Sequence, residues 1–164
     1  MIEVEVTGAQ VERAKELYNF GVLKNSIMKG KSNKYGAIGE ILVYDYFAPS
    51  YPIDFTSTFN YDMIINGFTV DVKTKRTTVT PKPHYYCSVS NDSTHQQCDM
   101  LFFVRVMENL SKAWLLGSID RLEFYQQATF KRKGELDTNG WKFKADCYNL
   151  EISQLNHTHY EKRN

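Results

Sequence analysis

Residues 61–73 read YDMIINGFTVDVK, two apolar runs joined by Asn66 and Gly67. An Asn-Gly pair between β-rich runs predicts a hairpin with a two-residue type I′ turn, because both turn residues must adopt a positive φ angle. Counting outward from this turn sets Asp62 directly opposite Asp71. The other expected cross-strand pairs are Ile65 with Phe68, Ile64 with Thr69 and Met63 with Val70.

Side chains alternate along a strand, so the expected hairpin has two chemically different faces. One face is apolar or aromatic throughout and comprises Tyr61, Met63, Ile65, Phe68, Val70 and Val72. The other face comprises Asp62, Ile64, Thr69, Asp71 and Lys73. Like charges directly opposite each other destabilise a sheet by up to about 1 kcal/mol. A hard divalent cation between the two carboxylates is the candidate that would offset this cost.

Asp62 and the triplet 71–73 (DVK) resemble the D…(D/E)-x-K signature of the PD-(D/E)xK nuclease superfamily, with Tyr61 where that signature has proline. These families usually add a glutamate upstream, on a helix packed against the sheet, and Glu40 in the segment GAIGE fits that place. The resemblance covers residues 35–75. It implies a restriction-endonuclease-like core of the α/β (α+β) class, with a mixed β-sheet flanked by helices.

The resemblance also implies a site for phosphodiester hydrolysis. Mg²⁺, or Mn²⁺ as its substitute, would be held by Asp62, Asp71 and the carbonyl of Val72. Glu40 would hold a second metal or a metal-bound water. Lys73 would help to deprotonate the attacking water or contact the scissile phosphate. Mg²⁺ suits such a site because it keeps several waters and takes only one or two carboxylates directly.

An ordinary surface ion pair remains the alternative interpretation of the hairpin. Asp62 could pair with Lys73 on a solvated face, with Asp71 merely exposed. Glu40 weighs against this, because it shares a helical stripe with two glycines and apolar residues, where an unpaired carboxylate is costly. The stripe comprises Gly36, Gly39, Glu40, Val43 and Phe47, and its glycines would let the helix backbone approach the sheet.

The candidate contacts with neighbouring phosphates are Lys34, Lys75 and Arg76. The net charge is only +1, but basic residues gather in residues 24–34, 73–82 and 131–133. Local basic clusters suit a protein that binds phosphates on one surface, although each cluster alone also fits a solvated loop. Some exonuclease-like branches of the superfamily use a glutamine downstream of the lysine to orient the nucleophile. Gln96 and Gln97 follow Lys73, but their spacing favours a structural role.

Patterns elsewhere predict the remaining elements. We expect an edge strand at residues 1–6, a helix from a Thr7–Gln10 capping box to about Leu23, a loop at residues 25–33 and a helix at residues 35–47. Further strands are expected at residues 85–90, 100–107, 113–119 and 141–150, with a helix at residues 120–130 capped by Asp120. The nearly continuous apolar run at residues 101–104 is typical of a strand covered on both faces.

The composition suits a single domain, residues 1–164, with its core at about residues 35–119. No apolar run approaches the ~18 residues of a membrane span, and no signal-peptide pattern is present, so we expect a cytoplasmic protein without a membrane partner. Its compartment would be the host cytoplasm if the gene belongs to a phage. Cys87, Cys98 and Cys147 lack C-x-x-C spacing and are expected to be reduced, buried thiols.

These features predict a Mg²⁺-dependent endonuclease or junction-resolvase-like enzyme that binds nucleic acid, with DNA as the favoured substrate. The small size favours a structure-directed or weakly specific enzyme of phage or mobile-element origin. The resemblance makes a homodimer plausible, because junction-resolving members of the superfamily are usually dimeric. The alternatives are a non-catalytic nucleic-acid-binding module with the same fold and a virion-associated structural protein.

Overall fold

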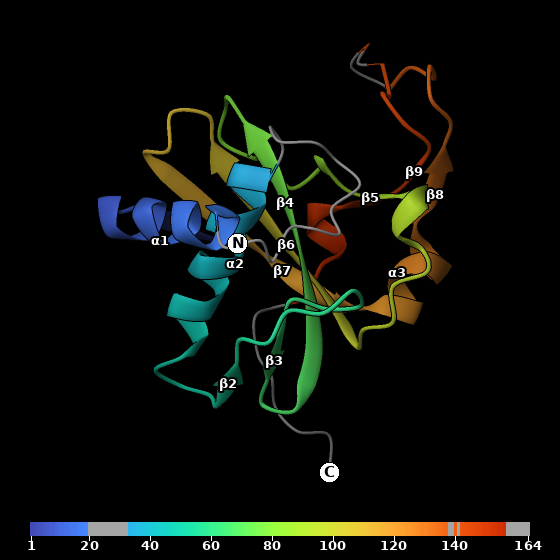
Figure 1. The fold of residues 1–164 in the computed structure, drawn as a ribbon. Coiled ribbons are helices and arrows are strands. Elements are labelled where there is room, and N and C mark those ends of the chain that lie inside the picture. Colours follow the sequence, from blue (N-terminus) through green and yellow to red (C-terminus); the bar gives the residue numbers. More distant parts are fainter. Residues whose placement is uncertain (20–32, 138–139, 141, 157–164) are drawn as a thin grey trace.

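The computed structural model describes residues 1–19, 33–137, 140 and 142–156, which form a mixed α+β structure (Figure 1). The larger of its two sheets has six strands in the order β1-β7-β6-β4-β3-β2. These strands are β1 (Ile2–Glu5), β2 (Ile53–Asp54), β3 (Met63–Ile65), β4 (Phe68–Thr77), β6 (Met100–Met107) and β7 (Lys112–Asp120). The smaller sheet, ordered β5-β9-β8, comprises β5 (Tyr86–Ser90), β8 (Thr129–Lys131) and β9 (Cys147–Glu151). The α-helices of the described residues are α1 (Gly8–Asn19), α2 (Asn33–Phe47) and α3 (Arg121–Gln127).

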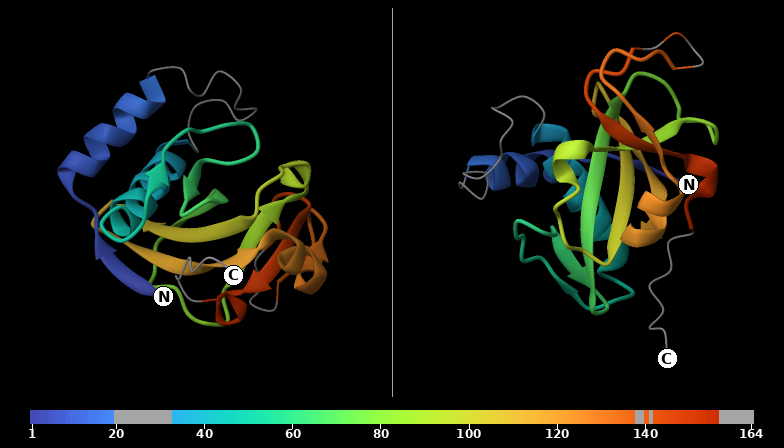
Figure 2. Two further views of the ribbon diagram at one scale, coloured as in Figure 1. Left: turned by 90° about the horizontal axis from the view of Figure 1, so that it is seen from below. Right: turned by 90° about the vertical axis from the view of Figure 1, so that its right-hand side faces the viewer.

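The six-stranded sheet separates two hydrophobic cores (Figure 2). Helices α1 and α2 cover one face, and α3 with the smaller sheet covers the other. Strand β6 contributes to both cores, because Phe102 and Val104 pack on the side of α2 while Leu101 and Phe103 pack on the side of α3. The prediction of a strand covered on both faces is therefore confirmed. The sheet is mixed, since β4 pairs with β6 in parallel and with β3 antiparallel.

The hairpin expected from Asn66 and Gly67 is present. Their φ angles are 48° and 86°, the two positive values that a type I′ turn needs. The observed register is Ile65 with Phe68, Ile64 with Thr69 and Met63 with Val70, as predicted. Met63, Ile65 and Val70 are fully buried in the core on the side of α2. The turn and the apolar alternation thus specify the same register.

Helix α2 lies close against β4 because Gly39 has no side chain. A Cβ at this position would collide with the side chain of Thr74 on β4. The prediction that Gly36 serves the same purpose is wrong, because a Cβ there would meet open space. Glu40 directly follows the point of closest approach, so its carboxylate is held near the edge of β4.

The N-terminal elements follow the predicted pattern. Strand β1 is an edge strand paired antiparallel with β7. Thr7 and Gln10 form the expected capping box, in which the Thr7 N–H donates to Gln10 Oε1 at 3.0 Å and the Gln10 N–H donates to Thr7 Oγ1 at 3.2 Å. The expected end of this helix near Leu23 and the loop at residues 25–32 lie outside the described residues.

Asp120 caps α3 as predicted, accepting hydrogen bonds from the N–H groups of Leu122 and Glu123. The helix ends at Gln127 rather than near residue 130, because Ala128 has an extended backbone with a ψ of 143° and leads directly into β8. The predicted extent of this helix was therefore wrong.

The final strand is shorter than predicted and belongs to a second sheet that the sequence pattern did not reveal. It begins at Cys147 instead of residue 141. The preceding segment is tied into a loop, since the Asp146 carboxylate accepts the Lys133 N–H at 2.7 Å. Strand β9 then pairs with β5, which lies about sixty residues earlier in the chain.

The three cysteines Cys87, Cys98 and Cys147 are unpaired and buried, which confirms the prediction made for them. Within the described part of the chain, no helix is long and apolar enough to cross a membrane.

Candidate functional site

The candidate site lies where β3 stops pairing with β4. The ladder between these strands ends at Met63 and Val70, so the edge of β4 is free of β3 from Asp71 onward. Asp62 does not continue the ladder. Its N–H donates to the carbonyl of Val70 at 2.9 Å, and its Oδ2 accepts the N–H of Val72 at 2.7 Å. The predicted direct cross-strand pairing of Asp62 with Asp71 is wrong, because Asp62 turns its carboxylate onto the edge of β4.

Asp71 is the most buried charged group of the site, with 2% of the residue exposed. Its Oδ2 lies 2.7 Å from Lys73 Nζ in an ion pair, yet no hydrogen bond reaches that oxygen. Lys73 lies two residues further along β4, and its ammonium also donates to Gln96 Oε1 at 2.7 Å. The two charges are thus neighbours on one face of β4, as the alternation of the strand predicted.

Gln96 closes this network. Its Nε2 donates to Asp71 Oδ1 and to the carbonyl of Phe59, each at 3.4 Å. The residue follows the short 3₁₀ helix η1 (Asn91–Ser93), and its N–H donates to the carbonyl of Ser93 at 3.2 Å. The sequence favoured a structural role for Gln96, but its side chain also contacts two residues of the candidate site, Lys73 and Asp71. The sequence signal for Gln96 was its position downstream of Lys73, where some exonuclease-like branches of the superfamily that the motif resembles carry a glutamine.

Glu40 reaches the site from α2. Burial is the main reason that its pKa rises to about 7, and the negative charge of Asp71 adds to the effect while Lys73 opposes it. The pKa of Asp62 is also raised, first by burial and then by the charges of Glu40 and Asp71. The N–H of Val72 and the ammonium of Lys73 act in the opposite direction. Three carboxylates are therefore close enough to disfavour their simultaneous ionisation.

This environment fits a hard divalent cation in charge and in donor type. Carboxylate oxygens are the ligands that Mg²⁺ prefers, and Asp71 Oδ2 is a buried oxygen that contacts the Lys73 ammonium but accepts no well-directed hydrogen bond. The carboxylates are not arranged as a complete set of metal ligands, however. Among the described residues, no three aspartate, glutamate, histidine or cysteine side chains form a group that could hold a metal ion. In the structure, the ammonium of Lys73 supplies the compensating positive charge at Asp71.

The predicted phosphate contacts lie around the site rather than within the carboxylate group. Lys34 is exposed in the first turn of α2, with Nζ 5.7 Å from the ring centre of Tyr35. Arg76 forms an exposed ion pair with Glu108 at 2.7 Å, so a phosphate would have to displace that carboxylate. Lys75 lines a pocket next to Lys73. Most of the basic cluster at residues 24–34 lies outside the described residues.

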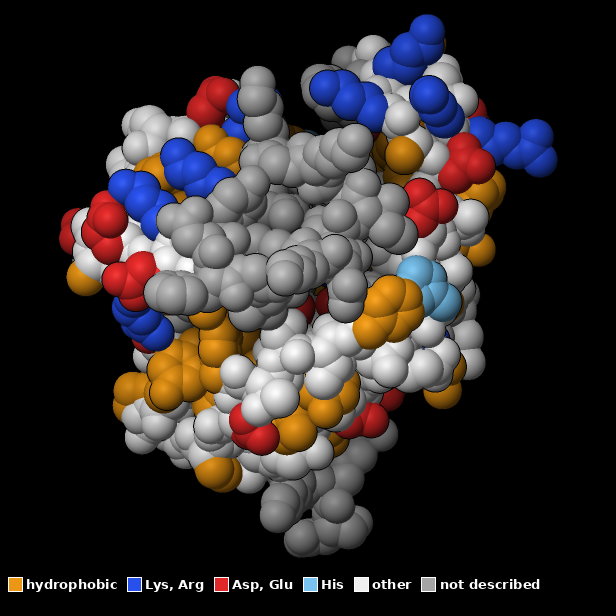
Figure 3. All heavy atoms as spheres, in the orientation of Figure 1, with side chains coloured by type: hydrophobic (Ala, Val, Ile, Leu, Met, Phe, Trp, Pro, Cys, Tyr) orange, Lys and Arg blue, Asp and Glu red, His pale blue; other side chains and the backbone are white. Residues whose placement is uncertain are grey.

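Basic side chains also gather at the upper right of the surface in Figure 3, over the segment between β8 and β9. The predicted cluster at residues 131–133 belongs to this region. Within it, Lys131 is 3.7 Å from Glu135 in an i,i+4 ion pair. Such surface pairs are weak, and the cluster does not contact the carboxylates of the candidate site.

An aromatic pair at the rim of the site was not predicted. The exposed ring of Phe59 stacks on His95, with ring centres 4.7 Å apart and an interplanar angle of 18°. The carbonyl of Phe59 accepts a hydrogen bond from Gln96, so this pair adjoins the Asp71–Lys73 network. An isolated Phe in a polar loop gives no sequence signal that separates a surface aromatic from a core residue.

Neither a scan against models of known protein families nor a search of curated proteins finds a match to this chain. The chemistry of the site is therefore inferred from the geometry of its own residues.

Proposed function

We propose that the protein is a metal-dependent nuclease with a restriction-endonuclease-like core, which hydrolyses phosphodiester bonds in nucleic acid and favours DNA. The supporting observation is the convergence of three acidic residues and a lysine at one edge of a mixed sheet. Glu40 comes from α2, Asp62 from the position just before β3, and Asp71 and Lys73 from β4. A buried group of like charges is costly unless it serves a function or is neutralised.

The acidic residues would hold the metal. Bound by Asp62 and Asp71, with the Val72 carbonyl as the further expected ligand, Mg²⁺ would polarise a phosphate and lower the pKa of a bound water. Glu40 would accept a hydrogen bond from water on the side of α2. Burial, and after it the proximity of the other carboxylates, raises the pKa of Glu40 and Asp62, and a bound cation would oppose that effect.

Lys73 would act on the reacting phosphate. Its ammonium is held between Asp71 and Gln96, so its position is restricted before any substrate binds. An ammonium fixed at this point can stabilise the charge that develops on the phosphate oxygens, and pre-positioned charges need little reorganisation during the reaction. Gln96 would keep Lys73 oriented after the metal displaces it from Asp71.

The test is cleavage of linear duplex DNA, single-stranded DNA, branched DNA and RNA, each with Mg²⁺, with Mn²⁺ and with EDTA. Asp71→Asn should abolish metal-dependent cleavage, because it removes a charge that holds the metal while keeping the shape of the side chain. Asp45→Asn is the matched control, since Asp45 pairs with Arg13 on the surface between α1 and α2. Equal behaviour of wild type and Asp71→Asn on every substrate would contradict the proposal.

One observation favours a second candidate, a non-catalytic nucleic-acid-binding module with the same fold. The ion pair between Asp71 and Lys73 partly neutralises the acidic group without any metal. This candidate predicts that Mg²⁺ neither stabilises the protein nor promotes cleavage, whereas nucleic acid still binds. Thermal unfolding with Mg²⁺ and with EDTA separates the two functions.

A further inference from the structure

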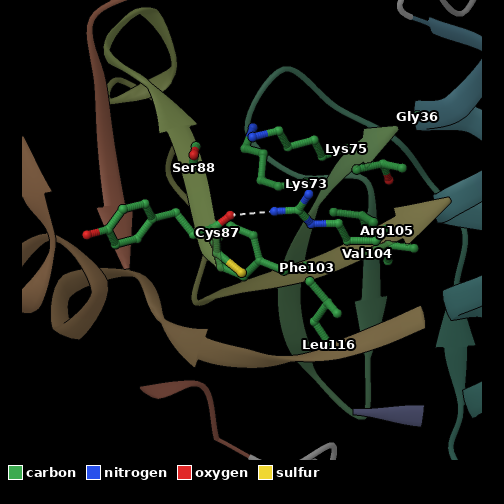
Figure 4. Close-up of a pocket in the computed structure, with 12 residues that line it drawn as sticks. Gly36, Lys73, Lys75, Cys87, Ser88, Phe103, Val104, Arg105 and Leu116 are labelled. Atoms are coloured by element: carbon green, nitrogen blue, oxygen red, sulfur yellow. Dashed lines mark hydrogen bonds between the residues drawn. The ribbon is translucent and has the colours of Figure 1, made fainter. Parts of the chain in front are cut away.

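A pocket of about 250 Å³ opens beside the candidate site, between β4, β5 and β6 (Figure 4). Its polar and charged lining residues are Lys73, Thr74, Lys75, Tyr86, Cys87, Ser88 and Arg105. Lys73 lines the pocket and also belongs to the candidate site, because its ammonium lies 2.7 Å from Asp71 Oδ2. The pocket is therefore continuous with the residues assigned to catalysis.

Arg105 is the central group of this pocket. Only 8% of the residue is exposed, and its guanidinium carries five N–H donors. The Nη2 group donates to the carbonyl of Tyr86 on β5 at 2.8 Å, and the guanidinium lies 5.9 Å from the ring centre of Tyr85. No carboxylate of the described residues forms an ion pair with Arg105. A buried guanidinium without an acidic partner is costly unless a ligand supplies the negative charge.

Lys75 adds a second cation at the same point. It is the direct partner of Arg105 in the parallel ladder between β4 and β6. Lys75 is exposed, but its amine is partly desolvated, which lowers its pKa, and the charge of Arg105 lowers it further. Asp137 has only the smallest effect in the opposite direction. Lys75 and Arg105 are therefore adjacent cations with little negative charge nearby. The candidate site beside them shows the reverse, a cluster of carboxylates.

The thiol that lines the pocket does not neutralise this pair. The thiol of Cys87 lines the pocket, but burial raises its pKa to about 12, so it is uncharged at neutral pH. Ser88 donates its hydroxyl proton to Asn149 Oδ1 at 2.7 Å and brings no charge. Of the remaining lining residues (Figure 4), Thr74 and Tyr86 bring hydroxyl groups rather than carboxylates, and the others are apolar residues or glycine.

We propose that this pocket binds a phosphate of the nucleic-acid strand next to the phosphate that is cleaved. The inference rests on the proposed nuclease function and assigns Arg105 and Lys75 as the groups that position the strand. Lys73 and Lys75 lie two residues apart on one face of β4, about 7 Å along the strand. This is the order of separation between successive phosphates of a nucleic-acid strand. The planar guanidinium can present two parallel N–H groups to one phosphate.

The first experiment measures the salt dependence of binding. Labelled single-stranded and duplex DNA are titrated with protein in EDTA, which prevents metal-dependent cleavage. Lys75→Met should weaken binding about tenfold at fixed salt and reduce the slope of log K against log [salt] by about 0.7 for single strands or about 0.9 for duplex. The control is Lys15→Met, which removes the same charge from an exposed ion pair with Glu12 on α1, a helix that contributes no residue to the pocket. Equal slopes for wild type and Lys75→Met would overturn the proposal.

The second experiment uses inorganic phosphate and does not depend on activity. In wild type, phosphate should shift the NMR signal of the Arg105 side-chain N–H and the amide signal of Cys87, and Lys75→Met should weaken this binding several-fold. Arg105→Lys keeps the positive charge but loses the two parallel N–H groups of the guanidinium. It should therefore bind phosphate more weakly than wild type. If Arg105→Lys fails to fold, Lys75→Met still decides the outcome. If phosphate does not shift these signals in wild type, the proposal that the pocket binds phosphate is wrong.

The two proposals fail in different ways. If the nuclease function is wrong but the pocket is right, no metal-dependent cleavage occurs and phosphate still binds at Arg105. If the pocket is wrong but the nuclease function is right, Lys75→Met cleaves with the KM and kcat of wild type. If both are right, Lys75→Met raises KM about tenfold and changes kcat less than twofold.

Discussion

The Asp62 carboxylate accepts the backbone N–H of Val72 at 2.7 Å, immediately beyond the last residue pair of β3 and β4. A side chain thus takes the place that a strand would occupy at the edge of β4. This hydrogen bond favours the charged form of Asp62, yet burial and the neighbouring charges of Glu40 and Asp71 raise its pKa nevertheless. The carboxylate is well oriented but electrostatically disfavoured, which is the state that a cation would relieve.

The first prediction concerns pH. The ordinary pKa of Glu40 is 4.5 and its value in the folded protein is about 7, so the folded state holds the proton more tightly than the unfolded chain. The resulting stabilisation is present below about pH 4.5 and is lost as pH rises through 7. The loss should be on the order of 2 to 3 kcal/mol. Urea unfolding of wild type and Glu40→Gln in EDTA, at pH 5 and pH 8, isolates this contribution.

Glu40→Gln should be more stable than wild type at pH 8 and should lose this advantage at pH 5. Mg²⁺ should stabilise wild type at pH 8 more than it stabilises Glu40→Gln, because the cation offsets the repulsion that the substitution has already removed. A difference between the two proteins that does not vary with pH would contradict the pKa assigned to Glu40.

The second prediction concerns the approach of α2 to the sheet. Gly39→Ala should lower the free energy of unfolding by about 1 to 3 kcal/mol, because its new Cβ collides with Thr74 and forces α2 to shift. Gly36→Ala, in the same helix, should raise it by about 0.5 to 1 kcal/mol, since the space is open and alanine favours helix. Chemical denaturation measures both. Adding Thr74→Ala to Gly39→Ala should recover part of the loss, whereas equal effects of both glycine substitutions would contradict this packing.

The part of the fold that could be predicted depends on local chemistry. Asn66 and Gly67 specify a turn, and the turn specifies the pairing of its neighbours. Glu40 was selected because the nuclease families that the motif resembles carry a glutamate upstream on a helix, and its helical stripe with Gly39 supported that choice. The departure of Asp62 from the ladder could not be predicted, since it depends on the free N–H of Val72 and on the packing of α2.

The remaining features depend on contacts between distant segments. Gln96 enters the site because η1 directs the chain back toward Phe59, which no short pattern encodes. The second sheet was missed because its strands are short and the pairing of Cys87 with Leu150 joins residues far apart in sequence. Arg105 was missed because it lies inside an apolar strand, where its register opposite Lys75 appears only once β4 and β6 are known to be parallel.

The third prediction concerns Gln96. Gln96→Leu keeps the approximate size of the side chain and removes its hydrogen bonds to Lys73 and Asp71. It should slow metal-dependent cleavage about 10- to 100-fold while changing the affinity for Mn²⁺ less than about threefold, because Gln96 orients Lys73 and holds no metal. Gln97→Leu is the control, since Gln97 instead contacts His95 and Arg121. Equal rates for the two variants would return Gln96 to a structural role.

The last prediction concerns competition between Lys73 and the metal. The ammonium of Lys73 lies 2.7 Å from Asp71 Oδ2, the oxygen that a cation would need. Removing it with Lys73→Met should therefore tighten the binding of Mn²⁺, by about tenfold if one ion pair of roughly 1.4 kcal/mol is relieved. Cleavage should nevertheless slow by at least about 100-fold, because the ammonium that would stabilise the charge developing on the phosphate oxygens is gone. Calorimetric titration with Mn²⁺ and single-turnover cleavage give the two quantities. A variant that binds Mn²⁺ more weakly than wild type, or that cleaves as fast, would contradict the roles assigned to Lys73 and Asp71.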